Sequence, residues 1–301
     1  MISISPDAAY WVALAHLQNW SREKINDFFD RLLRNHFTFH DFFALKPEEW
    51  ESLFHLSQEE IQTLQAAQQR IPYYVTITQK IYEQGFEIIP VHSKFYSTHL
   101  REKLGKSHAP TLFYAKGDIN LLNTPSVSIL GSNHGSGKGL IFTQNLIRCL
   151  VQENLALITS FEPGYHRYIL NLCLQFGGRV LVILNQGVLS LKQPLDEFNQ
   201  YVSNGQIVFL STIFPKNNNG RKWAFNRDLL QYGLAKDIYI ADALEKRQIW
   251  RWILRGLRQN KTFYVRIPEE NEKSANRFFI VNGAIPVDLN GKVIEKKEII
   301  F

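Results

Sequence analysis

The stretch PSVSILGSNHGSGKGL, residues 125–140, decides the fold of this 301-residue chain. Its apolar run 127–130 lies between Pro125 and Gly131, which is typical of a short strand buried on both faces of a parallel sheet. Four glycines occur from Gly131 onward, and apolar residues then recur at helical spacing up to Leu150. A strand, a glycine-rich turn and a helix in this order predict the opening of a doubly wound domain.

The glycine-rich turn also has the chemistry of an anion site. Backbone N–H groups at a helix start carry partial positive charge and Lys138 adds a full charge, so a phosphate is favoured. The alternative is a turn of small residues that only allows close helix–sheet packing. The phosphate-binding loop of ATPases requires glycine where this chain has Ser132, and serine or threonine where it has Gly139. The dinucleotide-binding pattern requires glycine where this chain has Leu140. We therefore expect neither an ATPase nor a dehydrogenase, and no cofactor.

Composition points to a globular protein with a polyanionic partner. The chain is 45% hydrophobic and carries a formal net charge of +6. Most of the excess charge lies between Lys216 and Arg266, where basic residues outnumber acidic ones. Cys149 and Cys173 lie in apolar helical patterns without metal-ligand spacing, and no apolar run approaches the ~20 residues of a membrane span. No secretory signal is visible, so we expect a cytoplasmic protein with reduced thiols.

Three segments follow from the order of the patterns. Residues 1–70 read as a small helical module whose Trp20 and Trp50 are most simply core residues. Residues 71–268 alternate strands and helices, which predicts an α/β Rossmann-like domain with a doubly wound, mostly parallel sheet. A charged linker and two strand-like runs form a short C-terminal β appendix at 269–301. The expected strands are 86–91, 110–115, 127–130, 155–160, 179–184, 207–211, 237–241 and 263–267.

The order of motifs resembles the DNA-processing protein A family (DprA, also called Smf). Residues 109–139, APTLFYAKGDINLLNTPSVSILGSNHGSGKG, are similar to the family's P-x-L-F-Y-x-K-G followed by V-x-I-V-G-S-R-x-x-T-x-Y-G. The pair Asn226-Arg227 matches the second half of the family's R-N-R. The chain departs from the family at Asn133 and Phe225, where the family has arginine. The winged-helix domain that often follows is not seen, so we expect a divergent member lacking it.

The resemblance implies a non-enzymatic, homodimeric protein that binds single-stranded DNA and delivers it to a RecA-type recombinase. Single-strand binders combine a basic groove with aromatic faces, and ligands of such sheets collect at the carboxyl ends of the strands. Stacking could come from Phe161, Tyr165, Trp223 and Phe225. Arg227 could instead form a salt bridge with Asp228 or Asp242. The expected nucleic-acid or phosphate contacts are Gly131, Ser132, Asn133, Lys138, Gly139, Arg221, Lys222, Asn226 and Arg227.

Three further possibilities stay open. The basic helix 245–258 places Arg247, Arg251, Arg255 and Arg258 on one face, either for DNA or as a solvated outer face. The departures from the family's motifs also fit a nucleotide-ligand sensor, or a regulatory subunit with a toxin-like partner in a bacterial antiphage defence module. A nucleotide hydrolase using Glu162, His134 or His166 has no catalytic triad, paired carboxylates or metal cluster to support it.

Overall fold

The computed structural model describes residues 7–131, 137–192, 194–218, 224–244, 248–272 and 274–295, with the side chains of 224–226 and 248–249 left aside. The chain divides into two compact units. The N-terminal unit comprises 1–116, 186–194 and 210–220, and the sheet unit comprises 117–185, 195–209 and 221–301.

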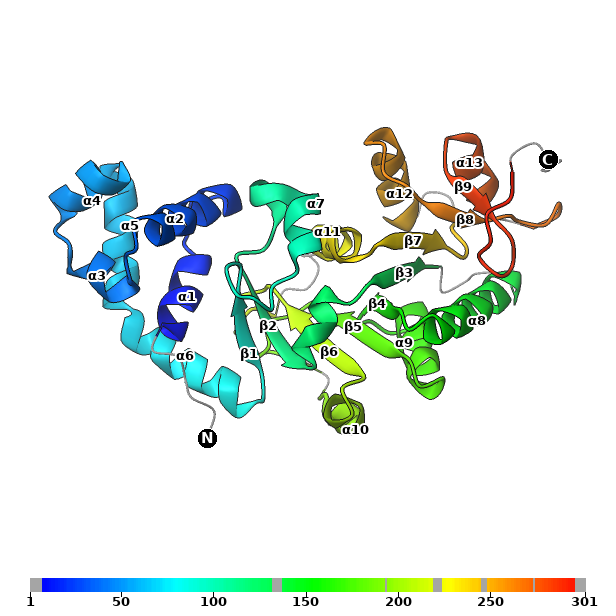
Figure 1. The fold of residues 1–301 in the computed structure, drawn as a ribbon, viewed down its shortest axis with the longest axis horizontal. Coiled ribbons are helices and arrows are strands. Elements are labelled where there is room, and N and C mark those ends of the chain that lie inside the picture. Colours follow the sequence, from blue (N-terminus) through cyan, green and yellow to red (C-terminus); the bar gives the residue numbers. More distant parts are fainter. Residues whose placement is uncertain are drawn as a thin grey trace. The chain divides into compact units, whose positions relative to one another are not determined.

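The N-terminal unit is mainly helical (Figure 1). Its β1 and β2 pair in antiparallel register, from Glu87 opposite Ala115 to Pro90 opposite Leu112. The elements are α1 (Ala8–Ala15), α2 (Arg22–Arg34), α3 (Phe39–Ala44), α4 (Pro47–Phe54), α5 (Gln58–Gln69), α6 (Ile71–Glu83), β1 (Glu87–Pro90), α7 (Thr98–His108) and β2 (Leu112–Gly117).

Aromatic side chains form the core of the first five helices. The rings of Phe42 and Trp50 stack with centroids 5.1 Å apart, and the Trp50 indole N–H donates to the carbonyl of Phe42 at 2.8 Å. Phe28 and Phe54 both pack edge-on against the ring of Phe42. Trp20 is buried beside Phe28. The interpretation of Trp20 and Trp50 as core residues is confirmed, which removes both from the surface that DNA could reach.

Helix α7 was not expected from the sequence. Its segment is rich in polar residues and lacks a long apolar stripe, and Ser97 caps its start by accepting from the N–H of Leu100 at 3.3 Å. Asp30 of α2 holds it in place, since its carboxylate lies 2.6 Å from Lys106 and 3.3 Å from Arg101. Ion pairs to a distant part of the chain thus help to hold the helix, together with its buried Leu100 and Leu104.

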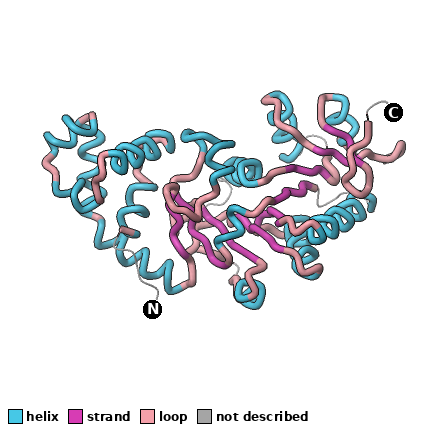
Figure 2. Tube along the Cα trace, viewed as in Figure 1, coloured by secondary structure: helices cyan, strands magenta, loops and turns pink. Residues whose placement is uncertain are grey.

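The sheet unit holds the parallel strands. Their order across the sheet is β6-β5-β4-β3-β7-β8-β9. Figure 2 shows the strands of this unit running between helices. The registers of β3 with β4 and β7, of β4 with β5, and of β8 with β7 and β9 are all parallel. This confirms the α/β class and the mostly parallel sheet. The strands are β3 (Ser126–Leu130), β4 (Ala156–Ser160), β5 (Arg179–Ile183), β6 (Ile207–Ser211), β7 (Asp237–Ile240), β8 (Tyr264–Arg266) and β9 (Ile285–Val287).

Helices cover both faces of this sheet. Ser126 donates to the carbonyl of Leu234 in α11, whereas Thr159 contacts His166 in α9. Ser126 lies opposite Ala156, and Thr159 is an odd number of residues further along β4, so the two side chains point to opposite faces. The helices are α8 (Gly137–Gln152), α9 (Tyr165–Gln175), α10 (Asn199–Ser203), α11 (Ala224–Leu234), α12 (Gln248–Arg258), α13 (Asn276–Val281) and the 3₁₀ turns η1 (Ile119–Asn123) and η2 (Asp196–Phe198).

The C-terminal segment differs from the expected pair of strand-like runs. Residues 276–281 form the helix α13, in which Asn276, Phe279 and Ile280 are buried at the helical positions i, i+3 and i+4 while Phe278 and Val281 remain exposed. The strand β9 then joins the sheet beside β8. The predicted charged linker begins with a hydrogen-bonded turn over residues 269–272, since Glu272 N–H donates to the carbonyl of Glu269 at 3.1 Å. The predicted domain boundaries remain a prediction.

Candidate nucleic-acid interface

The predicted site lies where the strands of the sheet unit end. Gly131 follows β3, Glu162 comes two residues after β4, and Ala241 and Ile267 directly follow β7 and β8. Because these strands are parallel, their carboxyl ends meet at one edge of the sheet. The four strand ends therefore bring together side chains from widely separated parts of the sequence.

Packing against an aromatic ring requires glycine at position 131. A Cβ at Gly131 would lie 2.3 Å from Cζ of Tyr165, closer than any real contact. Thr143 donates its hydroxyl proton to the carbonyl of Gly139 at 2.7 Å, so the Tyr165 hydroxyl donates to Thr143, also at 2.7 Å. Gly131 thus serves close packing, the alternative that the sequence left open, and a phosphate contact at Gly131 or Gly139 remains a prediction.

The stacking residues predicted after β4 are buried. Phe161 is 8% exposed and packs edge-on against Phe209 and against Phe198, while Tyr165 is 6% exposed beneath Gly131. Neither ring presents a face to solvent, so the prediction that they stack on DNA bases was wrong. Trp223 and the side chain of Phe225 lie outside the described residues.

Arg227 is locked in a cluster of carboxylates. Its Nη1 lies 2.6 Å from Oε1 of Glu162, and its Nη2 lies 2.7 Å from Oδ1 of Asp228. Burial acts to lower the pKa of Arg227, but the two carboxylates outweigh burial and hold it above its ordinary value. The Arg227 side chain is only 13% exposed. The structure thus has the salt bridge to Asp228 that the sequence allowed, and adds a second partner, Glu162.

His166 lies beside this cluster, in the first turn of α9. Burial, followed by the positive charge of Arg227, lowers the pKa of His166 to about 4. Its Nδ1 lies 3.2 Å from the hydroxyl oxygen of Thr159. The imidazole is therefore neutral at physiological pH, with one nitrogen engaged in the core of the sheet unit.

The lowered pKa of His166 predicts acid sensitivity. An unfolded chain binds this proton near pH ~6.5, so stability is complete above that pH and falls as the pH drops toward the folded pKa. On going from neutral to acidic pH, the wild-type protein loses free energy of unfolding because His166 must take up a proton. We expect this loss to be about 2 kcal/mol smaller in the variant His166→Gln. Urea unfolding at both pH values measures this. The control His40→Gln, at an exposed histidine, should lose as much stability in acid as the wild type. If wild type, His40→Gln and His166→Gln all lose the same amount, His166 is not the source of the acid sensitivity.

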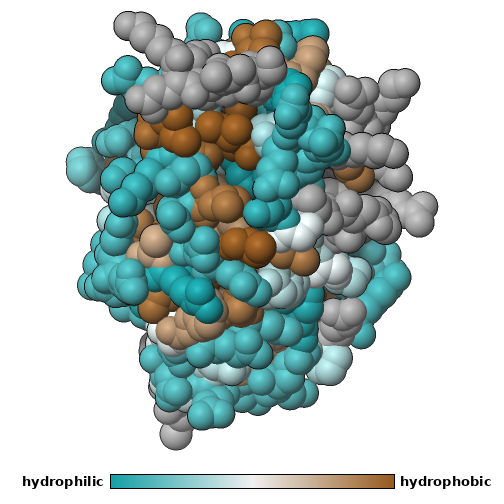
Figure 3. All heavy atoms as spheres, turned by 90° about the vertical axis from the view of Figure 1, so that its right-hand side faces the viewer, coloured by the Kyte–Doolittle hydropathy of each residue, from teal (hydrophilic) through white to brown (hydrophobic). Residues whose placement is uncertain are grey.

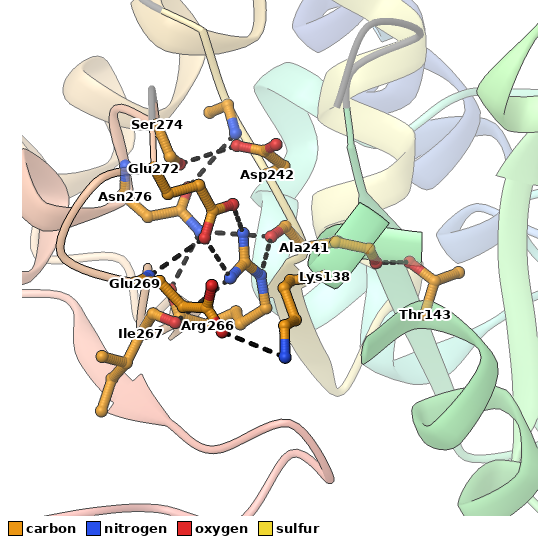
Figure 4. Close-up of polar contacts among 12 residues, drawn as sticks. Lys138, Thr143, Ala241, Asp242, Arg266, Ile267, Glu269, Glu272, Ser274 and Asn276 are labelled. Atoms are coloured by element: carbon orange, nitrogen blue, oxygen red, sulfur yellow. Dashed lines mark hydrogen bonds and ion pairs between the residues drawn. The ribbon is translucent and has the colours of Figure 1, made fainter. Parts of the chain in front are cut away.

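A second ionic cluster lies at the ends of β7 and β8 (Figure 4). Arg266 is 1% exposed, donates Nε–H to the carbonyl of Ala241 at 2.7 Å, and forms a two-point ion pair with Glu272. Asn276 is completely buried and donates to the carbonyls of Ala241 and Arg266. Sequence reasoning missed these residues. The available signal was an arginine inside the apolar strand 263–267, followed by acidic residues.

Lys138 is the other predicted cation whose side chain the structure describes. Its Nζ lies 3.0 Å from Oε1 of Glu269, and both side chains are well exposed, at 42% and 63%. Figure 4 shows the lysine reaching toward the turn that carries this glutamate. Both described cations of the predicted site therefore already pair with carboxylates.

Ser132, Asn133, Arg221 and Lys222 lie outside the described residues, as does the side chain of Asn226 in α11. On α12, Arg251, Arg255 and Arg258 are exposed, and Arg247 lies outside the described residues. In the described part of the chain, no three metal-ligating side chains gather in a way that could hold an ion. No helix there is long and apolar enough to span a bilayer.

Known proteins share this architecture. The X-ray structure of DNA processing protein A from Streptococcus pneumoniae is similar with a TM-score of 0.65 at 17% identity, covering 92% of this chain and 93% of that one. A structure described as giving insight into the single-stranded DNA binding mode of DNA processing protein A from Helicobacter pylori has a TM-score of 0.53 at 18% identity, covering 67% and 90%. At these identities the similarity concerns the fold.

Sequence comparison gives the family. DNA processing protein DprA of Streptococcus pneumoniae (strain ATCC BAA-255 / R6) is 25% identical over 136 residues, 45% of this chain and 48% of that protein. The chain thus spans about half the length of the curated relative it matches. The family model of the DNA recombination-mediator protein A matches residues 87–296, well over half of the chain. The chain belongs to the DNA recombination-mediator protein A family, the DprA family that its motifs resemble.

Proposed function

We propose that this protein binds single-stranded DNA as a non-enzymatic DNA-processing protein. The observation that carries the proposal is the family match over residues 87–296, which includes almost all of the sheet unit. The single-stranded DNA binding described for the Helicobacter pylori protein supports the ligand class. The net charge of +6 supplies the long-range attraction that a polyanion needs.

The exposed cations of the sheet unit are the best candidates for phosphate contact. Arg251, Arg255 and Arg258 follow each other at intervals of four and three residues, so they share one face of α12. Lys138 at the start of α8 is also accessible to solvent. Arg227 is mostly buried with its charge neutralised, so we assign it a structural role at this edge of the sheet.

Removing the α12 charges should weaken DNA binding. We expect the triple change of Arg251, Arg255 and Arg258 to glutamine to lower affinity for oligo-dT at least about tenfold near 0.1 M salt, because each lost phosphate contact forgoes counterion release. The slope of log affinity against log salt should fall by about 2, at ~0.7 for each contact. Fluorescence anisotropy over a salt series measures both quantities.

A control of equal charge change comes from the N-terminal unit. Exposed Arg34, Lys46 and Lys80 changed to glutamine alter the net charge by the same amount. If this control loses as much affinity as the α12 variant, net charge rather than the α12 face governs binding. If neither variant nor wild type binds oligo-dT, the proposed function is wrong.

Two finer properties belong to the same proposal. The family's description as a recombination mediator supports delivery of the bound strand to a RecA-type recombinase. A homodimer is supported by exposed apolar side chains on α8, on α13 and after β9; Figure 3 looks onto this part of the molecule. They are Leu140, Ile141, Phe278, Val281 and Val293. A nucleotide sensor in a toxin-associated defence module and a cytoplasmic location remain predictions.

A further inference from the structure

An acidic turn lies directly against the first turn of α8. Residues 269–272 read Glu-Glu-Asn-Glu, and together with Gly137, Lys138 and Ile141 they line a cavity of about 610 Å³. The start of a helix carries partial positive charge, and Lys138 adds a full one. The turn thus sets carboxylates at the position where the sequence predicts a phosphate of nucleic acid.

One end of this turn is firmly anchored. Glu272 pairs with the buried guanidinium of Arg266, and its Oε2 also accepts from the backbone N–H of Glu269 at 3.0 Å. Arg266 in addition donates to the carbonyl of Ile267 at 3.2 Å. The charge of Glu272 is therefore already neutralised, and the backbone of the turn is fixed relative to β8.

The other end is held weakly. Glu269 is 63% exposed and its contact to Lys138 is a single ion pair at 3.0 Å. Glu270 is exposed as well. Exposed ion pairs of this kind are screened by solvent and contribute little stability. The Glu269 side chain can thus leave Lys138 by side-chain rotation while the anchored backbone keeps it close enough to return.

We propose that Glu269 is an autoinhibitory counterion: in the free protein it occupies Lys138, and a DNA phosphate must displace it. This inference rests on the proposed single-stranded DNA binding and adds how access to one cation is controlled. The competing carboxylate is tethered, so its effective concentration at Lys138 is high whatever the solution contains. Competition from the Glu269 carboxylate lowers the affinity for DNA at Lys138, and removing that carboxylate raises the affinity.

The test is a double-mutant cycle on oligo-dT binding. Near 0.1 M salt we expect Glu269→Gln to tighten binding about fivefold, the scale of one solvent-screened charge. Lys138→Ala should cost little in the wild type, where Glu269 already neutralises the lysine. In the Glu269→Gln background, the same Lys138→Ala change should cost at least about fivefold. This coupling is what the proposal specifically requires.

The matched control is Glu153→Gln. Glu153 is exposed just beyond the other end of α8, which at 16 residues is about 24 Å long, so the net charge changes equally but far from Lys138. If Glu153→Gln and Glu269→Gln tighten binding equally, or the cycle shows no coupling, the inference is wrong while the proposed function stands. If none of the proteins binds oligo-dT, the proposed function falls and the inference falls with it.

Discussion

Replacing Arg266 by alanine should lower the free energy of unfolding by about 3–5 kcal/mol, the largest single effect we expect in the sheet unit. The guanidinium is 1% exposed and neutralises Glu272, whose side chain is only 9% exposed. Its removal leaves the buried carboxylate of Glu272 without its Arg266 counterion and the carbonyl of Ala241 without its Arg266 donor. Urea denaturation of wild type and variant measures the loss.

The double variant of Arg266 and Glu272 to methionine separates the ion pair from packing. Two apolar side chains of similar length leave no uncompensated buried charge, so we expect most of the lost stability to return. A double variant as unstable as the alanine variant would show that the lost packing and the Arg266 hydrogen bond to Ala241 dominate. An alanine variant within 1 kcal/mol of wild type would contradict the cluster as described.

Gly131→Ala should destabilise the protein by about 3 kcal/mol through overpacking. The added methyl would lie 2.3–2.6 Å from three atoms of the Tyr165 ring, and that ring is held by its hydrogen bond to Thr143. Thermal or urea unfolding gives the size of the effect. A smaller residue at position 165 should make the same change less costly, which a double-mutant cycle with Tyr165→Leu measures.

Gly137→Ala is the control for that prediction. A Cβ at Gly137 meets nothing within 4 Å, and Gly137 begins α8, where alanine is the better helix former. We expect this change to be neutral or stabilising by up to about 1 kcal/mol. Equal destabilisation at both positions would mean that the glycine-rich turn needs glycine for its backbone rather than for the contact with Tyr165.

The parallel sheet was predictable because each strand carries its own signal. The run 207–211 was expected and found at the same residues, and the run 179–184 was found one residue shorter. Fully buried strands read as continuous apolar runs, so no knowledge of their partners is needed. Helix α13 was missed because its apolar run, the four residues 278–281, is too short for its length or periodicity to separate a helix from a strand.

The electrostatics of the site could not be predicted in the same way. Lys138 pairs with Glu269 and Arg227 pairs with Glu162, and each pair joins residues far apart in the sequence. A count of basic residues shows an excess of positive charge but not which cations are already neutralised. Only the fold, which brings distant segments together at the strand ends, decides that, and here it places Arg227 against Glu162 and Asp228.

The most direct test of this account is a comparison of single- and double-stranded oligonucleotides of one sequence, titrated near 0.1 M and near 0.3 M salt. We predict tighter binding to the single strand, and an affinity that falls steeply with salt, by about tenfold or more if three or more phosphates are contacted. Binding that is absent, or that does not change between the two salt concentrations, would contradict the claim that exposed cations of the sheet unit hold a nucleic-acid strand.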